Sequence, residues 1–189
     1  ETDTIEVRSG KRPTTHLYFA YNKPRGVITH SPQEAETDIR ESVPELSKDG
    51  VFPVGRLDKD SHGLIILTND GRITDRLLNP NTEHEKEYLV KTKFVLRDSF
   101  RKHMEAGVDI EGYMTKPTTV KIQGEKTFSI ILTEGKKHQV RRMVVAMHNE
   151  VEDLKRNRVL NIKLGKLKAG EFRPIEGEEL AEFLKSLGL

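Results

Sequence analysis

The stretch from residue 51 to residue 71 reads VFPVGRLDKDSHGLIILTNDG. Residues 51–57 and 63–70 are apolar pieces typical of strands, and the closing Asn-Asp-Gly is a turn signal. Several charged residues crowd the junction of the two pieces, including Arg56 and Asp58. We therefore expect two strands joined at the rim of a sheet by a turn that carries carboxylates.

The segments on either side show further strand and helix patterns. Strands are expected at 16–30 with a break at 22–26, at 86–94, 108–114, 118–123, 127–135, 156–165 and 171–175. Helices are expected near 70–78, 97–107, 137–147 and 177–188, and residues 31–50 are expected to be a surface excursion. Strands outnumber helices and do not alternate with them regularly. The pattern predicts an α+β fold with a central, mostly antiparallel mixed sheet flanked by helices.

Composition excludes several classes of protein. The 189 residues include 32 Lys and Arg against 30 Asp and Glu, no Cys, and 34% hydrophobic residues, which suits one soluble domain. Disulfides, cysteine–zinc sites and thiol nucleophiles are therefore excluded. The longest apolar run, Met143–Met147, is far too short for a membrane span, and no signal segment opens the chain. We expect an intracellular, cytoplasmic protein.

Charge is distributed unevenly along the chain. Residues 133–163 carry eight Lys and Arg against four Asp and Glu, whereas the residues from 171 onward are acidic. Such segregation permits a nucleic-acid-binding face without an extreme overall charge, although a solvated surface with chance clusters would look the same.

Three places in the sequence could carry chemistry. An extended chain would place Arg56 on the same face as Asp58, where the cation would favour an ionised carboxylate suited to a nucleophile or an electrostatic stabiliser. A turn with one surface ion pair, or a glycosidase pair of Asp58 and Asp60, is the alternative. Tyr88 follows Lys86 on a strand and is either a functional aromatic or half-buried core.

The third place is the segment EGKKHQVRRM, residues 134–143. Val140 and Met143 define the apolar face of a helix, and Arg141 lies at the border of that face, where it can reach inward. The alternative is a solvated basic helix end. Phosphate loops, dinucleotide fingerprints, zinc-protease spacings and a serine-hydrolase elbow around Ser61 are all absent from the sequence.

Taken together, GRLDKDSHGLIILTNDG, HEKEYLV and ILTEGKKHQVRRM resemble, in this order, the signature segments of the pseudouridine synthases. The resemblance covers about residues 16–175 and is strongest to the family of RsuA, RluB, RluE and RluF, with RluF the most similar. It implies the pseudouridine synthase catalytic fold with an RNA-binding cleft over residues 16–189. Residues 1–15 resemble the last strand and linker of an N-terminal RNA-binding module.

The resemblance also implies roles for particular residues. Asp58 matches the catalytic aspartate, Arg141 matches the arginine that pairs with it, and Tyr88 matches the aromatic residue that stacks on the target base. Further residues are expected to bind RNA, with the basic ones near the helix contacting phosphates: Arg56, Lys86, Lys136, Lys137, His138 and Arg142.

The implied activity is isomerisation of a uridine to pseudouridine, with large-subunit (23S) ribosomal RNA favoured as the target. No metal or other cofactor, no membrane and no second subunit is expected. A transfer RNA target and a non-catalytic RNA-binding module are the alternatives. The sequence leaves open whether Asp58 attacks the base, attacks the sugar or removes a proton.

Overall fold

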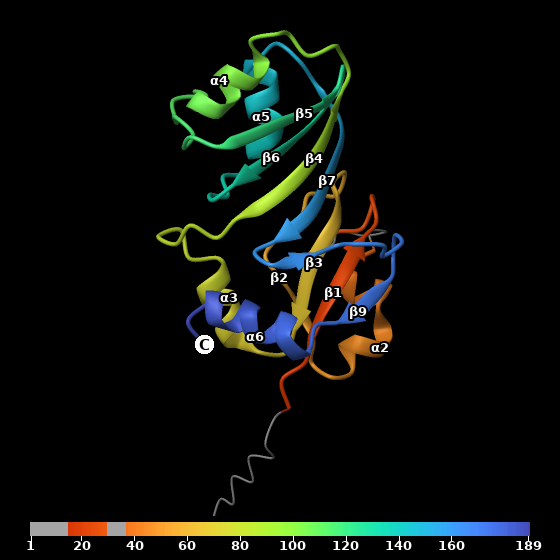
Figure 1. The fold of residues 1–189 in the computed structure, drawn as a ribbon. Coiled ribbons are helices and arrows are strands. Elements are labelled where there is room, and N and C mark those ends of the chain that lie inside the picture. Colours follow the sequence, from red (N-terminus) through yellow and green to blue (C-terminus); the bar gives the residue numbers. More distant parts are fainter. Residues whose placement is uncertain (1–14, 30–36) are drawn as a thin grey trace, which may run out of the picture.

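The computed structural model describes residues 15–29 and 37–189, which form one mixed sheet of nine strands flanked by helices (Figure 1). The strands are β1 (Tyr18–Lys23), β2 (Phe52–Val54), β3 (His62–Thr68), β4 (Lys86–Thr92), β5 (Thr119–Gly124), β6 (Thr127–Leu132), β7 (Val151–Val159), β8 (Ile162–Lys163) and β9 (Phe172–Pro174). The helices are α1 (Ile39–Ser42), α2 (Pro44–Ser47), α3 (Gly71–Leu77), α4 (Phe100–Ala106), α5 (Gln139–Ala146) and α6 (Gly177–Ser186). The predicted α+β class is confirmed.

The order of strands across the sheet is β5-β6-β4-β7-β3-β1-β9, with β2 paired to β3 and β8 paired to β7. Among these described strands, β3 and β7 pair in parallel and the other pairs are antiparallel. The sheet is therefore mostly antiparallel and mixed, as predicted. Its middle, where β4, β7 and β3 lie side by side, connects the two halves seen in Figure 1.

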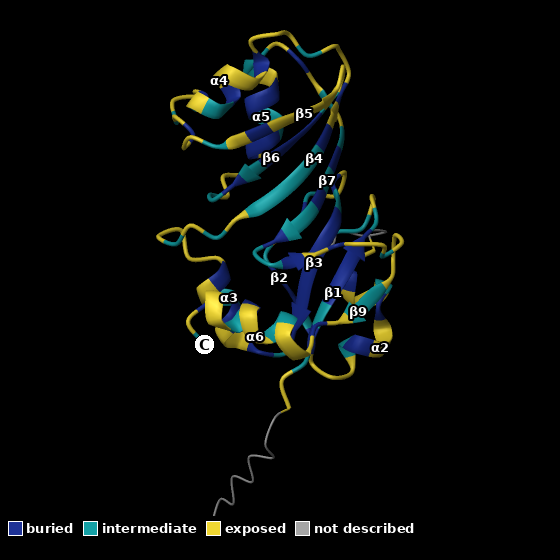
Figure 2. Cartoon of the chain, viewed as in Figure 1, coloured by how far each residue is buried: buried dark blue, intermediate teal, exposed yellow. Residues whose placement is uncertain are grey.

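Strand β3 is apolar from Leu64 to Leu67 because both faces of this part are covered. Leu64 and Ile66 belong to the core that α3 and α6 close, whereas Ile65 and Leu67 belong to the core on the opposite face. Successive side chains of a strand point to opposite faces, so a continuous apolar run serves both cores. Figure 2 shows β3 buried, while α3 and α6 expose their outer faces.

The other half of the sheet packs against α5. Val140, Met143 and Val144 of this helix are buried in one cluster with Phe128 and Ile130 of β6. The spacing i, i+3, i+4 of the helical residues puts all three on one face, as the sequence predicts. This packing fixes α5 beside the middle of the sheet and determines where its polar border residues lie.

Gly63 is needed where the two halves meet. It pairs with Arg156 in the short parallel contact between β3 and β7, and its φ is +106°. A Cβ atom there would lie 2.3 Å from the Arg156 carbonyl oxygen. Only glycine permits this approach of the two backbones.

The expectation of a plain surface excursion at 31–50 is wrong for residues 37–50. Residues 39–47 form α1 and α2, and Ile39, Val43 and Leu46 are buried against the face of the sheet that carries Tyr21 and Ile65. That face of β1 and β3 is apolar and has to be covered. Residues 30–36, the rest of the excursion, lie outside the described residues.

Two expected strands are also absent from the described chain. Residues 108–114 form a turn closed by a hydrogen bond from Ile110 N to Tyr113 O at 2.8 Å, with positive φ at Glu111 and Gly112. After the break at Gly26, the strand restart is reduced to a single bridge at Ile28.

The proposed remnant of an N-terminal module falls mostly on residues 1–14, which lie outside the described residues. None of the described helices is long and apolar enough to cross a membrane.

Candidate active site

The loop between β2 and β3 carries Asp58 and is held from several sides. The Ser61 N–H donates to the Asp58 carbonyl at 3.0 Å. The Thr29 hydroxyl accepts from Leu57 N at 3.2 Å and donates to Leu57 O at 2.9 Å. These bonds hold the carboxylate of Asp58 at the rim of the sheet, as the turn pattern predicts.

The charged partners of Asp58 come from the start of α5. His138 Nε2 lies 3.3 Å from Asp58 Oδ1, and Arg141 Nε lies 3.9 Å from Asp58 Oδ2. Arg141 Nη2 also donates to the Ser61 hydroxyl at 3.0 Å. The structure thus brings Asp58 and Arg141 together, but in a looser pair than the buried one expected, since their side chains are 39% and 27% exposed.

The segment that carries His138 is fixed by a network around Glu134. Its carboxylate accepts from the Tyr113 hydroxyl at 2.5 Å, from Lys116 N at 2.9 Å and from Gln139 Nε2 at 2.7 Å. Burial opposes ionisation of Glu134, but these hydrogen bonds outweigh burial and lower its pKa. His138, which has a φ of +52°, is the residue directly before α5.

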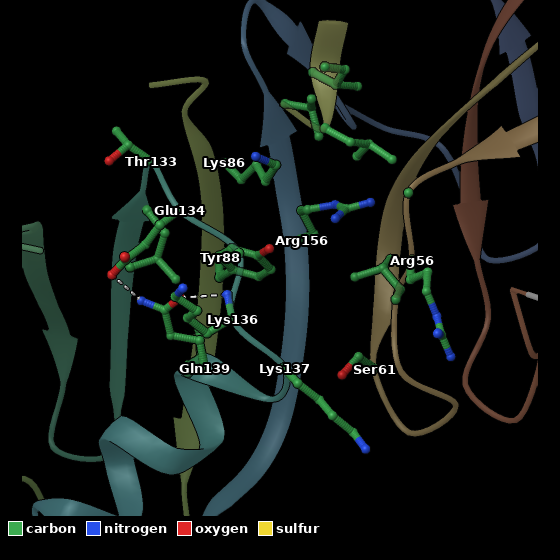
Figure 3. Close-up of a pocket in the computed structure, with 18 of the residues that line it drawn as sticks. Arg56, Ser61, Lys86, Tyr88, Thr133, Glu134, Lys136, Lys137, Gln139 and Arg156 are labelled. Atoms are coloured by element: carbon green, nitrogen blue, oxygen red, sulfur yellow. Dashed lines mark hydrogen bonds between the residues drawn. The ribbon is translucent and has the colours of Figure 1, made fainter. Parts of the chain in front are cut away.

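Tyr88 lies on β4 opposite Arg156 of β7, and both side chains line the same cavity as Lys86. Tyr88 and Lys86 are half-buried, whereas Arg156 is 5% exposed. The alternation of β4 puts residues 86 and 88 on the same face of the sheet. Figure 3 shows the three side chains projecting from neighbouring strands.

This cavity has a volume of about 600 Å³ and lies between the two halves of the sheet. Its walls come from the Asp58 loop, the end of α3, β4, the segment 132–140 and β7. Its size suits a single nucleotide or another small ligand. An acid, an aromatic ring and several cations therefore face one space.

The other predicted binding residues divide into two groups. Arg56, Lys136, Lys137 and His138 line the cavity, whereas Arg142 does not appear among the lining residues. Arg142 Nη2 instead donates to Ile110 O at 2.8 Å and pairs with Glu111 at 2.7 Å. Arg56 forms no ion pair with Asp58, whose charged partners are His138 and Arg141. The strand β2 ends at Val54, and Gly55 bends the chain with a φ of +79°, so the strand alternation assumed for residues 56 and 58 does not continue.

The family model of the RNA pseudouridylate synthases matches residues 17–146. The chain belongs to this family. The family named from the three sequence segments is thereby confirmed, as is the pseudouridine synthase fold.

The pseudouridine synthases that resemble this chain include proteins from distant bacteria. It is 39% identical to the "Dual-specificity RNA pseudouridine synthase RluF" of Escherichia coli (strain K12) over 169 residues, 89% of this chain and 58% of that protein. It is 38% identical to an "Uncharacterized RNA pseudouridine synthase" of Aquifex aeolicus, covering 100% of this chain and 78% of that protein. A solved pseudouridylate synthase superposes with a TM-score of 0.80 at 29% identity, over 91% of this chain and 74% of that one.

The chain thus spans 58% of the length of the RluF proteins that it matches, and it is close to them in sequence.

Sequence reasoning missed several residues of this pseudouridine synthase site. Arg156 lies on a strand that also carries Lys155 and Arg158, and nothing in that pattern distinguishes it from its neighbours. Glu134 and Gln139 belong to the segment 134–143 that the sequence analysis singled out, but the hydrogen bond between them depends on the conformation of the loop and could not be predicted.

Proposed function

We propose that this chain isomerises a uridine to pseudouridine in RNA, and that large-subunit ribosomal RNA is its substrate. The observation that carries the proposal is the position of Asp58, which its loop holds in the cavity wall beside His138. Arg141, which is not itself a lining residue, approaches the same carboxylate at 3.9 Å. A relative from Bacillus subtilis is named ribosomal large subunit pseudouridine synthase B, which supports the choice of RNA.

The reaction breaks the bond between ribose C1′ and uracil N1 and forms a bond between C1′ and C5. C5 loses its hydrogen and N1 gains one, so the product is an isomer and no donor or redox partner is required. The base must leave the RNA stack to reach a cavity of this kind. Tyr88 supplies a ring on which the uracil stacks, and Asp58 supplies the carboxylate that starts the reaction.

The cations at the cavity mouth serve RNA binding in this proposal. Lys136 and Lys137 line the cavity next to the Asp58 partners and contact phosphates, as does Arg56 on the opposite side.

All of the proposed residues come from one chain, which supports action as a monomer, and a ribosomal substrate would place the protein in the cytoplasm. Sedimentation of the free protein tests the monomer.

Release of tritium from transcripts that contain 5-tritiated uridine tests the activity directly. We expect release from large-subunit ribosomal RNA, and mapping of the product should give a single major site. Transfer RNA forms the second arm, because the RluF relatives are named dual-specificity enzymes. No release from any RNA, together with normal RNA binding, would show that the chain is an RNA-binding module without activity.

A further inference from the structure

Two cations on the inner wall of the cavity lack an acidic partner. Within residues 15–29 and 37–189, neither Lys86 nor Arg156 forms an ion pair with a carboxylate. Lys86 Nζ donates to the His84 carbonyl at 3.1 Å, and Arg156 Nε donates to the Leu64 carbonyl at 2.8 Å. Both side chains line the cavity beside Tyr88 (Figure 3).

Lys23 shows how backbone carbonyls of this fold satisfy a buried ammonium. It is fully buried, and its ammonium donates to the carbonyls of Pro24 at 2.9 Å, Val27 at 2.7 Å and Lys59 at 3.5 Å. An ammonium has three donors, so those of Lys23 are all used. Lys86 uses one on the protein, which leaves two for the contents of the cavity.

Keeping two unpaired cations together in a half-buried place is unfavourable for the empty protein. Burial, and then the nearby charge of Arg156, lower the pKa of Lys86 to about 8. An anion bound in the cavity would remove this penalty, so the arrangement indicates a ligand that carries or acquires negative charge.

We infer that Lys86 and Arg156 stabilise the negative charge that the uracil ring acquires during the isomerisation, an inference that rests on the proposed pseudouridine synthase activity. If Asp58 attacks C1′, or removes a ribose proton so that the base is eliminated, the electron pair of the C1′–N1 bond stays on N1 and is shared with O2 and O4. If Asp58 attacks C6, the electron pair of the C5–C6 double bond moves onto the ring and O4. Each route produces a ring anion next to Tyr88.

The charge lasts only until the new bond forms. C5 attacks C1′ and displaces the Asp58 carboxylate from it, or adds to the eliminated sugar while the abstracted proton returns to the ribose; on the C6 route the C1′–N1 bond breaks and the Asp58 carboxylate leaves C6 again. The ring is then neutral, and loss of the C5 proton to a base with uptake of a proton at N1 completes the product. Cations fixed where charge develops favour the anion over the neutral uridine, and therefore raise the rate more than the affinity. This assigns Lys86 to the base and separates it from Lys136 and Lys137, which are proposed to contact phosphates.

The test compares Lys86→Met with the wild type and with Lys91→Met, a control on the same strand whose lysine is exposed and pairs with Glu152 at 2.8 Å. The substrate is a ribosomal RNA transcript that the wild type modifies. We expect Lys86→Met to lower the single-turnover rate at saturating RNA about 10²-fold, as for the loss of one oxyanion donor. RNA affinity and its salt dependence should stay unchanged, and Lys91→Met should match the wild type.

Lys86→Arg, which keeps the charge, should recover part of the lost rate, whereas Lys86→Gln should not. An unchanged rate in folded Lys86→Met overturns the inference. Weaker RNA binding with a salt slope smaller by about 0.7–0.9 and an unchanged rate also overturns it, because Lys86 would then contact a phosphate. If the wild type modifies no RNA, the proposed function fails, and that result is distinct from an active enzyme that is indifferent to Lys86.

Discussion

Arg156 and Arg158 lie two residues apart on β7, but their guanidinium groups have very different partners. Arg158 has a side chain that is 17% exposed and pairs with Glu85 and Glu87, each at 3.0 Å. Arg156 is buried at the cavity and donates to a backbone carbonyl. The same strand therefore carries one cation that the protein neutralises and one whose charge remains available to the cavity.

The contrast extends beyond this strand. Arg173 pairs with Glu179 at 2.7 Å, and Arg72 pairs with the buried Asp70 at 2.8 Å, both outside the cavity. Lys86, by contrast, lines the cavity and donates to a backbone carbonyl. The difference separates charges that stabilise the fold from charges that are available for a substrate.

The largest expected effect comes from the acid of the cavity. Asp58→Asn should lower pseudouridine formation by at least about 10³-fold, because an amide cannot act as nucleophile or base. The melting temperature should change little, since the carboxylate is 39% exposed and its contacts are loose. Asp60→Asn in the same loop is the matched control and should stay active. Substantial turnover by Asp58→Asn would remove the acid from the mechanism.

Asp70, whose ion pair with Arg72 lies outside the cavity, should show the opposite result, a loss of stability without a loss of activity. This residue caps α3 and accepts hydrogen bonds from the Arg72 side chain at 2.8 and 2.9 Å and from the Tyr18 hydroxyl at 2.7 Å. Asp70→Ala should lose about 3 kcal/mol of unfolding free energy, because a buried charge network and a cap are removed. Turnover per folded molecule should be unchanged, as should the stability of the exposed control Asp75→Ala.

The same site predicts the pH dependence of that difference. Hydrogen bonds from Arg72, aided by Tyr18, hold the pKa of Asp70 far below its usual range. A lowered pKa in the folded state contributes stability above the unfolded pKa of about 4 and loses it as pH falls toward the folded value. Denaturant titrations of wild type and Asp70→Ala should therefore converge below about pH 4. A constant gap would contradict the ionic origin.

Tyr88 tests whether the ring beside the unpaired cations has a stacking role. Stacking on a base contributes about 1–3 kcal/mol, so Tyr88→Leu should lose roughly tenfold to a hundredfold in activity with little change in stability. Tyr88→Phe keeps the stack and isolates the hydroxyl, whose loss matters only if it relays a proton. Full activity of Tyr88→Leu in the tritium assay would show that Tyr88 is only a half-buried core residue without a stacking role.

The smallest effect is expected from the cations at the cavity mouth. Lys136→Ala and Lys137→Ala should each weaken RNA binding and reduce the salt slope by about 0.7–0.9, with little effect on turnover at saturating RNA. Arg142→Ala should change the slope less, because its guanidinium is held by Glu111 and Ile110. Equal changes at residues 137 and 142 would show that RNA also crosses the face that carries Arg142.

Periodicity was enough to predict β3, β4 and α5, because in each the apolar residues are spaced as the element requires. It failed at α1 and α2, where the helices are only four residues long and exist because an apolar face of the sheet needs cover. It also failed at residues 108–114, where apolar alternation coincides with a turn built on positive φ at residues 111 and 112.

The site was predictable where a residue's place depends on a single element. The helix pattern predicted that Arg141 can reach inward, and the family resemblance implied its pairing with Asp58; the two side chains lie 3.9 Å apart. The contact of His138 with Asp58 depends on a left-handed residue and on the Glu134 network, which no spacing reveals. Arg156 and Arg158 differ only in what surrounds them after folding.

The central claim is that cavity cations without an acidic partner serve the reaction, whereas cations paired with carboxylates outside the cavity serve the fold. Melting temperature and single-turnover rate, measured together for Lys86→Met and Arg158→Met, test it most directly. We predict that Lys86→Met loses rate but no stability, because it removes a charge without a partner. Arg158→Met should keep its rate and lose about 1–3 kcal/mol, a fall of about 2–4 °C in melting temperature per kcal/mol. A stable, fully active Lys86→Met, or an Arg158→Met that loses rate without losing stability, would contradict the account.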